Sequence, residues 1–447
     1  MSTSSPSPEE LAAEIDRLRL QNQRLRIELA DARAREDVPR RGLVNAATRL
    51  PGRALNLART VRSALTARSA KVRPSSALPP PYRLRQLHPT RPVRPRVLHV
   101  IANFHLGGSS RLVVDLIEGL GHAYDQLVVA DDLPASPAYE GVALEHHPAR
   151  TLDAARERFR AHRPDFVHVH YLAHHRDKYG AHAWAWYRPW FEAAEQLGVR
   201  VIENINIPTE PYVSDSVACY VHVSDYVRHR FGRQDGRHVT IYPGSDLDLF
   251  ALPPGVEVAD DCLGMVYRLA RDKLDERAME PFIEAIRLRP GTRALIVGGG
   301  ISLESYRRRV AEAGMEDAFE FTGYVEYEAL PALYRRMSVF VAPVHRESFG
   351  QVTPFAMGMQ LPVVGYDVGA IPEIVGDDTL IAPAGDGVRL GAVAAALLDD
   401  RARRIAIGAA NRARAEQLFS VRAMVAAYEE LYGELTMAHQ AAVAEGT

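Results

Sequence analysis

The chain has 447 residues, 47% of them hydrophobic and 25% charged, which is typical of soluble globular proteins and long enough for two domains. No apolar run approaches the roughly 18 residues that span a bilayer, and the polar, acidic start MSTSSPSPEE does not fit a secretory signal. The two cysteines, Cys219 and Cys262, lie far apart beside apolar residues, so we expect reduced thiols in a cytoplasmic protein.

Residues 1–37 are expected to form a short coiled-coil helix. Between residues 9 and 33, the a and d positions of a coiled-coil heptad are apolar at Leu11, Ile15, Leu18, Leu25 and Leu29, with the polar Asn22 at one a position. A single Asn in an a position favours a parallel homodimer, because two amides can pair across the seam. The alternative is a solvated helix, since three heptads are few.

Residues 38–96 form a strongly basic, proline-containing segment. Fourteen arginines and lysines and no acidic residue lie in it, whereas residues 97–447 carry more acidic than basic groups. Two interpretations have equal weight: an amphipathic stretch in residues 40–96 that makes peripheral contact with the inner face of an anionic membrane, or a basic linker. Nucleic-acid binding is not expected, because no aromatic residue precedes Tyr82 to stack on bases.

From Arg96 onward, short apolar runs alternate with helical stretches, a pattern that predicts an α/β fold with doubly wound parallel sheets. Strands are expected at 97–102, 127–130, 166–170, 200–202, 220–223 and 239–242, and in a second series at 262–266, 294–298, 319–321, 339–342 and 362–366. Helices are expected at 110–120, 152–162, 188–197, 275–288, 302–313, 327–336, 352–359, 387–399, 401–417 and 420–438. A break at Pro253-Pro254-Gly255 separates two Rossmann-like domains, 97–250 and 260–417, and a C-terminal helix and tail follow at 418–447.

Ligands of open parallel sheets bind beyond the carboxyl ends of the strands, where this sequence places glycines and charges. Gly107 and Gly108 follow the first expected strand and open a helix, a turn that lets backbone N–H groups approach an anion. Arg268 and Lys273 follow the strand at 262–266, and two such cations suit a diphosphate. Taken singly, these stretches also fit ordinary turn geometry and surface charge.

A carboxylate follows the strand at 339–342. Glu347 can accept hydrogen bonds from sugar hydroxyls, and the backbone of Ser348, Phe349 and Gly350 can donate hydrogen bonds to this carboxylate or to a phosphate. The following Thr353-Pro354 is typical of the start of a helix.

The order of these motifs resembles that of the retaining glycosyltransferases of family 4, among the glycosyl transferases group 1, which have the GT-B fold. The resemblance covers roughly residues 97–420 and excludes the first 96. The motifs that carry it are Gly107-Gly108, Asp165–His170, Pro243-Gly244-Ser245-Asp246, Arg268 with Lys273, Gly323-Tyr324-Val325, Glu347-Ser348-Phe349-Gly350 and Gly369-Ala370-Ile371-Pro372-Glu373. Each motif alone is unspecific, and their order makes the resemblance.

The resemblance implies a role for each matching residue. Arg268 and Lys273 would hold the donor diphosphate and stabilise the leaving group, and Glu347 would contact hydroxyls of the donor sugar. His170 would lie on the acceptor side, beside the reacting carbon. The remaining donor-binding positions would be Gly107 and Gly108 beside the phosphates, Tyr324 and Val325 at the nucleotide base, and Ser348, Phe349 and Gly350 near the sugar. Neither a cofactor nor a metal ion is implied, since the nucleotide-diphosphate sugar is a co-substrate.

The sequence departs from the family at Phe355, where a second glutamate usually holds the ribose hydroxyls. Loss of hydrogen bonds to a charged acceptor costs about 1.5–3 kcal/mol, roughly ten- to a hundredfold in affinity. Three interpretations follow: another group such as Thr353 holds the ribose, the donor is unusual, or the donor site is degenerate. Ala370 stands where a second glycine is common, but this change removes no charge.

The histidines at 168, 170, 174 and 175 do not form a convincing zinc motif, because only His168 and His170 share a strand face and no cysteine is near. The aromatic group Trp184, Trp186 and Trp190 is interpreted as helix packing in preference to a sugar-stacking surface.

We therefore expect a glycosyltransferase that moves a sugar from a nucleotide-diphosphate sugar to a glycan, lipid-linked or small-molecule acceptor. A catalytically degenerate binding or scaffold protein of the same fold is the alternative, motivated by Phe355. Another reaction on this fold, such as phosphorolysis or epimerisation, is a third hypothesis.

Overall fold

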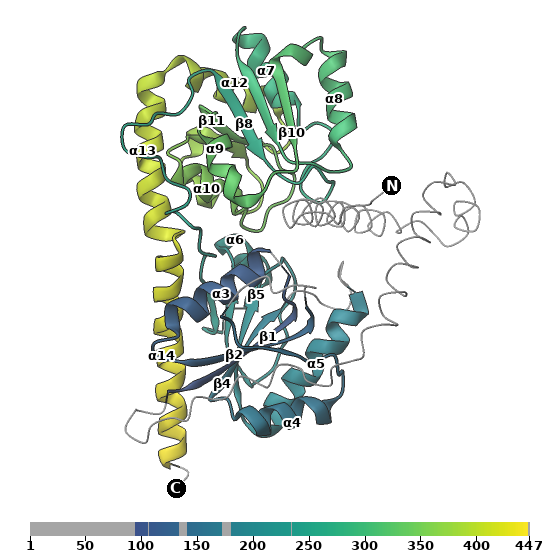
Figure 1. Cartoon of the computed structure of the whole chain (residues 1–447), viewed down its shortest axis with the longest axis vertical. Helices are drawn as coiled ribbons and strands as arrows, with labels where there is room; N and C mark the ends of the chain where they lie inside the picture. The colour runs from purple at the N-terminus through teal and green to yellow at the C-terminus, as the bar shows by residue number, and fades with distance from the viewer. Residues whose placement is uncertain (1–93, 106, 134–140, 172–179, 234, 446–447) are drawn as a thin grey trace, which may run out of the picture. The chain divides into compact units, whose positions relative to one another are not determined.

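The computed structural model describes residues 94–105, 107–133, 141–171, 180–233 and 235–445 (Figure 1). The predicted coiled coil and nearly all of the basic segment lie outside these residues. Residues 94–447 make up one compact unit. Among the described helices, none combines the length and the apolar character that crossing a bilayer requires.

The first sheet has seven parallel strands in the order β3-β2-β1-β4-β5-β6-β7. Their bounds are β1 Arg96–Asn103, β2 Asp125–Asp132, β3 Leu144–His146, β4 Phe166–Tyr171, β5 Arg200–Ile205, β6 Val217–His222 and β7 His238–Thr240. β4 is buried along its whole length, as expected for a central strand covered by helices on both faces. Six of the strands were predicted; the three-residue β3 was missed because it has no apolar run.

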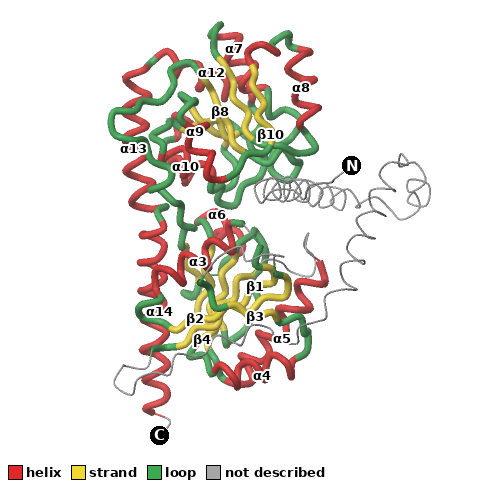
Figure 2. The backbone as a smooth tube through the Cα atoms, viewed as in Figure 1, coloured by secondary structure: helices red, strands yellow, loops and turns green. Residues whose placement is uncertain are grey.

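The second sheet has six parallel strands in the order β10-β9-β8-β11-β12-β13. Their bounds are β8 Cys262–Val266, β9 Arg293–Val297, β10 Phe319–Gly323, β11 Val339–Ala342, β12 Val363–Tyr366 and β13 Ile381–Ala382. Figure 2 shows the two groups of strands, each with its own helices. The predicted α/β class with two doubly wound parallel sheets is confirmed.

Twelve α-helices are described, with the bounds α3 Gly108–Leu120, α4 Leu152–His162, α5 Gly180–Leu197, α6 Asp225–Phe231, α7 Glu280–Leu288, α8 Leu303–Glu312, α9 Leu330–Tyr334, α10 Val352–Gly358, α11 Ile371–Val375, α12 Gly387–Asp399, α13 Arg401–Leu418 and α14 Val421–Glu445. The predicted helix at 275–288 was too long, because the helix begins only at Glu280, with Pro281 in its first turn. The predicted helix at 188–197 was too short, since Pro189 lies inside α5.

Two short helices were not predicted. In α6, the Ser224 hydroxyl accepts a hydrogen bond from the Val227 N–H and caps the helix start. In α11, Pro372 occupies the first turn and Gly376 ends the helix in the left-handed region, at φ 70°. Both helices are too short to show a helical period in the sequence.

The C-terminal helix α14 packs on the domain of the first sheet, beside α3 (Figure 1). Met424, Tyr428 and Tyr432 are buried in one apolar cluster with residues of β1, β4 and α3, including Val97, Phe166 and Leu112. Full burial of one large apolar side chain contributes about 1.5–3 kcal/mol, so these three residues fix the helix on the sheet. The chain thus returns to its first domain after completing the second.

The two connections between the domains lie side by side. The Ser245 N–H donates to the Phe419 carbonyl over 2.7 Å, and the Val421 N–H donates to the Ser245 carbonyl over 3.3 Å. Gly244 is required there, since a Cβ at this position would lie 2.7 Å from Val421 Cα.

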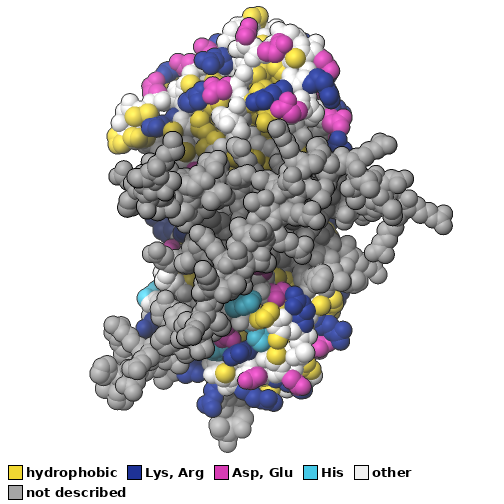
Figure 3. All heavy atoms as spheres, turned by 45° about the vertical axis from the view of Figure 1, so that its right-hand side comes forward, with side chains coloured by type: hydrophobic (Ala, Val, Ile, Leu, Met, Phe, Trp, Pro, Cys, Tyr) yellow, Lys and Arg dark blue, Asp and Glu magenta, His cyan; other side chains and the backbone are white. Residues whose placement is uncertain are grey.

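In the coloured part of the surface in Figure 3, basic and acidic side chains are interspersed and no single sign of charge dominates.

Candidate active site

The charged residues singled out in the sequence converge at the carboxyl edge of the second sheet. Lys273 belongs to the loop that follows β8, and Glu347 to the loop that follows β11. β8 and β11 are hydrogen-bonded neighbours, so their carboxyl ends lie side by side. Two residues 74 positions apart in the sequence therefore come into contact.

Lys273 and Glu347 form a two-pronged ion pair. The Lys273 Nζ lies 2.8 Å from Glu347 Oε1 and 3.0 Å from Oε2, and the Ser348 N–H donates to Oε1 over 3.1 Å. The Glu347 side chain is only 2% exposed, whereas the Lys273 side chain is 42% exposed. The carboxylate is thus fixed in place, while the Lys273 side chain remains partly open to solvent, from which a second anion can approach.

Two glycines make room for Glu347, one beside its carboxylate and one beside its backbone carbonyl. Gly350 has φ 79°, and a Cβ there would lie 2.8 Å from Glu347 Cδ. Gly369, in the loop after β12, has φ 58°, and a Cβ there would lie 1.9 Å from the Glu347 carbonyl oxygen. Ala370 has φ −85°, which any residue adopts, so the alanine in place of the usual second glycine is structurally harmless.

Arg268 is engaged with Asp272 one turn along the same loop, and its side chain is 38% exposed. Within the described part of the chain, no hydrogen bond or ion pair joins Arg268 to Lys273 or Glu347. Arg268 would therefore have to share or exchange its carboxylate partner to reach a diphosphate.

Phe349 supplies packing with its side chain. Its ring is 5% exposed, lies 5.9 Å from the Tyr242 ring in a stacked arrangement, and meets the Phe419 ring edge-on at 5.8 Å. Only its backbone remains for the predicted contact near the sugar. The Ser348 N–H, also considered for a ligand, is already used by Glu347.

Phe355 stacks on Phe250, with ring centroids 4.0 Å apart and an interplanar angle of 4°, and Tyr327 meets it edge-on at 5.8 Å. The position that usually carries the second glutamate is therefore an apolar aromatic stack. Thr353, considered as another ribose ligand, is completely buried, and its hydroxyl oxygen lies in the interior.

Tyr324 lies beyond β10, with its ring against the backbone of Gly299. A Cβ at Gly299 would lie 2.7 Å from the Tyr324 ring, and Gly298 and Gly300 have positive φ angles of 127° and 152°. This run of three glycines after β9 was not predicted to belong to the site, although three consecutive glycines at a strand end were a visible signal. Val325, the other residue predicted at the base, is half-buried beside Tyr324.

The loop after β1 approaches the start of α10. Gly107 is exposed, with room for a ligand where a side chain would be, since nothing lies within 4 Å of a Cβ there. A Cβ at Gly108 would lie 3.3 Å from Gln351 Oε1, and Gln351 also donates to the Gly244 carbonyl over 2.7 Å. Gln351 thus lies against the glycine loop and hydrogen-bonds to Gly244, contacts that the sequence did not reveal.

Glu373 of α11 connects the second domain to the first. Its carboxylate accepts hydrogen bonds from the N–H groups of Asp225 and Tyr226, over 2.9 Å and 2.8 Å, at the start of α6. Burial raises the pKa of Glu373, and these two hydrogen bonds oppose that shift. The glutamate of the Gly369–Glu373 motif therefore caps a helix of the other domain.

His170 is completely buried, at the carboxyl end of β4. Its Nε2 lies 3.1 Å from the Nδ1 of His99, and its carbonyl accepts from the Tyr187 hydroxyl over 2.7 Å. Burial, reinforced by His99, lowers the pKa of His170 well below its ordinary value, so this imidazole is neutral. The structure thus places the predicted acceptor-side histidine in the interior of the first domain.

His99 and His168 complete a buried group with His170, and one ring nitrogen of each lies within 4.8 Å of the others. His168 Nδ1 lies 2.7 Å from the Tyr432 hydroxyl of α14. His99 was not among the predicted histidines, while His174 and His175 lie outside the described residues. Trp186 and Trp190 are buried, which agrees with packing.

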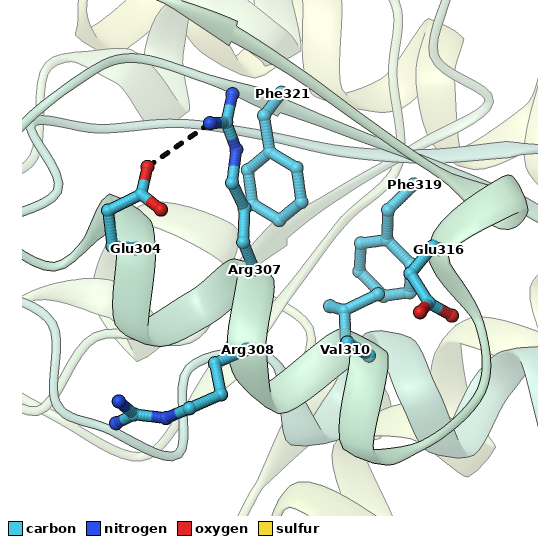
Figure 4. Close-up of a pocket in the computed structure, with 8 residues that line it drawn as sticks. Glu304, Arg307, Arg308, Val310, Glu316, Phe319 and Phe321 are labelled. Carbon is cyan, nitrogen blue, oxygen red and sulfur yellow. Dashed lines mark hydrogen bonds and ion pairs between the residues drawn. The ribbon is translucent and has the colours of Figure 1, made fainter.

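A pocket of about 560 Å³ lies elsewhere on the second domain, between α8 and β10 (Figure 4). Arg307 lies over the Phe321 ring at 5.8 Å and pairs with Glu304 over 3.1 Å. None of the predicted site residues lines this pocket. A second pocket, of about 400 Å³, adjoins the Lys273 loop and is lined by Arg271, Leu274, Asp275, Glu276, Arg277 and His345.

Comparison with known proteins supports the interpretation of the second domain. Residues 262–400 match the sequence model of the family described as Glycosyl transferases group 1. The chain is 34% identical over 190 residues to the lipopolysaccharide core biosynthesis mannosyltransferase LpsB of Rhizobium meliloti (strain 1021), covering 40% of this chain and 54% of LpsB. It is 34% identical over 153 residues to the 2-deoxystreptamine N-acetyl-D-glucosaminyltransferase of Streptomyces fradiae, covering 33% and 36%. The chain thus spans about half, or less, of the length of these relatives.

Solved structures resemble almost the whole described unit. The Anabaena protein Alr3699/HepE in complex with UDP aligns with a TM-score of 0.62 at 16% identity, over 76% of this chain and 100% of its own. A glycosyltransferase from Rickettsia africae ESF-5 aligns with a TM-score of 0.63 at 14% identity, over 76% and 98%. These likenesses establish the fold. The chain therefore has the GT-B fold expected from its sequence, and over residues 262–400 it resembles Glycosyl transferases group 1.

Proposed function

We propose that this chain is a glycosyltransferase that moves a sugar from a nucleotide-diphosphate sugar to a glycan, lipid-linked or small-molecule acceptor, with retention of anomeric configuration, as in family 4. The observation that carries the proposal is the Lys273–Glu347 pair. It combines a buried, fixed carboxylate and a half-exposed ammonium at the carboxyl edge of the second sheet, within the residues that match Glycosyl transferases group 1.

The exposed side of Lys273 suits the diphosphate of the donor. Negative charge develops on the leaving phosphate as the sugar–phosphate bond breaks, and a fixed ammonium stabilises that charge. Arg268 lies on the same loop, and its side chain is 38% exposed. Its guanidinium can donate two parallel hydrogen bonds to the diphosphate if it keeps only part of its contact with Asp272. With two protein cations in these roles, the proposed reaction uses no metal ion and no cofactor.

Glu347 is proposed to hold hydroxyls of the donor sugar. Its two oxygens already accept from Lys273 and from the Ser348 N–H, so it is poorly placed to act as a nucleophile. In the proposed step the bond from the anomeric carbon to the phosphate oxygen breaks. A bond to the acceptor oxygen forms on the same face, and the acceptor proton passes to the departing phosphate.

The comparisons support a nucleotide-sugar donor without choosing its base. One relative, from Mycobacterium tuberculosis (strain CDC 1551 / Oshkosh), is named as GDP-mannose-dependent and is 29% identical over 224 residues. The structural neighbour Alr3699/HepE was solved with UDP. Both UDP- and GDP-sugars therefore belong in a donor screen.

Phe355 favours a second candidate, a binding protein of the same fold without turnover. Its stacked ring offers no acceptor for a ribose hydroxyl. This hypothesis predicts no transfer from any donor and no calorimetric binding of UDP- or GDP-sugars.

The test is a screen of UDP- and GDP-sugars by calorimetry and by mass spectrometry of the products. We expect one donor to bind and to be consumed, with Lys273→Ala and Glu347→Gln abolishing turnover while the circular dichroism spectrum is kept. Arg271→Ala is the matched control, because it removes a 75%-exposed cation of the same loop that pairs with Glu276. Wild-type turnover by both site variants would refute the site assignment.

A further inference from the structure

A row of hydrogen bonds runs diagonally across three neighbouring strands of the first sheet. Gln126 lies on β2, His99 on β1 and His170 on β4, all on one face of the sheet. Gln126 Oε1 lies 3.0 Å from His99 Nε2, and His99 Nδ1 lies 3.1 Å from His170 Nε2. We call this row the Gln126–His99–His170 chain.

The direction of each hydrogen bond follows from the glutamine. The Gln126 amide nitrogen donates to the carbonyls of Leu116 and Ile117, over 3.3 Å and 3.4 Å, so its Oε1 is the atom that faces His99. An amide oxygen only accepts, so the proton lies on His99 Nε2. His99 Nδ1 is then unprotonated, and His170 Nε2 must be the donor to it.

His170 is thereby held in one tautomer. A neutral imidazole has a single N–H, so with the proton on Nε2 its Nδ1 bears a lone pair. Both rings are fully buried, and burial is the main cause that lowers the pKa of each, to about 4 for His99. His170 Nδ1 has no hydrogen-bond partner among the described residues. A buried acceptor without a partner is costly, which indicates that another group uses it.

We infer that Gln126 and His99 are positioning residues that hold His170 as its Nε2–H tautomer and keep its Nδ1 as the hydrogen-bond acceptor for a hydroxyl of the sugar acceptor. The inference rests on the proposed function. Ligands of parallel sheets bind beyond the carboxyl ends of the strands, and His170 is the residue before Tyr171, where β4 ends. In the opposite tautomer Nδ1 would carry a proton and repel that hydroxyl's hydrogen.

The same three histidines invite comparison with a metal site, but two observations argue against one. An ion held between His99 Nδ1 and His170 Nε2 would need a lone pair on each atom, whereas these two atoms share a proton. The group, which includes His168, contains no carboxylate to balance a divalent charge in a fully buried setting. A bound metal ion is therefore an outcome that would overturn the inference.

Histidine tautomers can be read directly from the ¹⁵N chemical shifts of the full-length protein labelled in its histidines. We expect a protonated Nε2 and an unprotonated Nδ1 for His170, assigned with His170→Gln. His99→Leu removes the acceptor of the His170 proton and should mix the two tautomers. His99→Asn keeps an oxygen at the Nδ1 position and should restore the wild-type pattern. Tyr432→Phe removes only the neighbouring His168 bond and should leave the His170 tautomer unchanged.

Kinetics separates positioning from a structural role. With the donor found in the screen, and octyl glucoside and octyl mannoside as probe acceptors, His99→Leu should lower kcat/KM for the acceptor about tenfold while the donor Kd stays constant, and His99→Asn should recover most of the loss. A protonated Nδ1 on His170, one equivalent of bound zinc by elemental analysis, or wild-type kinetics for His99→Leu would overturn the inference. A wild-type protein that binds no donor would refute the proposed function instead, and with it the role assigned to Nδ1, whereas the tautomers would still test the chain itself.

Discussion

Lys273→Ala should destabilise the protein more than Glu347→Gln does, although both changes remove the same ion pair. The reason is the unequal exposure of the two partners, 42% for the Lys273 side chain and 2% for that of Glu347. Without Lys273, the buried carboxylate keeps one hydrogen-bond partner among the described residues, the Ser348 N–H. Without the carboxylate charge, the ammonium can be solvated by water.

The expected magnitude lies between two limits. Removing one partner of a fully buried pair costs about 3–5 kcal/mol, and breaking an exposed pair costs about 0–1 kcal/mol. Since one partner is buried and the other half-exposed, we expect about 1–3 kcal/mol for Lys273→Ala and under about 1 kcal/mol for Glu347→Gln. The double variant should be more stable than Lys273→Ala alone, because a neutral amide leaves no unpaired charge.

Urea unfolding followed by circular dichroism measures these differences as shifts in midpoint, with Arg271→Ala as the exposed-cation control. A double variant no more stable than Lys273→Ala, or a Glu347→Gln variant equally destabilised, would refute the reasoning. The donor Kd tests the role of Lys273 independently of stability. Lys273→Ala should weaken donor binding about ten- to a hundredfold, the value of a charge-assisted contact to phosphate.

Further predictions concern pH, the helix cap, the aromatic stack and the N-terminal helix. Burial raises the pKa of Asp115 from 3.8 to about 6, so the folded state binds this proton more tightly than the unfolded state does. The free energy of unfolding should therefore fall as pH rises from about 4 through 6. Asp115→Asn should flatten that part of a stability–pH profile. Glu373→Ala should lower stability by about 1–2 kcal/mol in thermal unfolding, with Glu373→Gln less affected, because two helix N–H groups lose their acceptor. Phe355→Ala should cost about 3–5 kcal/mol through the lost stack on Phe250, and a near-neutral result in urea unfolding would contradict that packing role. Deleting residues 1–37 should convert a dimer into a monomer by light scattering, and an unchanged mass would exclude the predicted coiled coil.

The sequence was sufficient to predict most of the fold because its information is local. Alternating apolar runs and helical stretches marked eleven of the strands. The helices α3, α4, α12 and α13 were placed within two residues, whereas α5 and α14 were predicted too short. The elements that were missed or misplaced also have local causes. β3 has only three residues and β13 two, and Pro281 delays the start of α7 in a stretch whose periodicity continues before it.

The candidate site was predictable in part for a related reason. In a parallel sheet, residues that follow neighbouring strands must meet at one edge, so the topology brought Lys273 to Glu347. The same rule does not say which side chains face inward. Thr353 was considered for the ribose and His170 for the acceptor side, and the structure buries both side chains.

By itself, the sequence determined the two parallel sheets, the glycines and charges at their carboxyl edges, and the departure at Phe355. Only the tertiary structure decided which partners these residues have. Phe355 stacks on Phe250, Glu373 caps a helix 148 residues earlier in the chain, and His99 meets His170 across two strands. The physical reason is that local periodicity reports which residues are buried, whereas the pairing of distant side chains depends on how whole elements pack against each other.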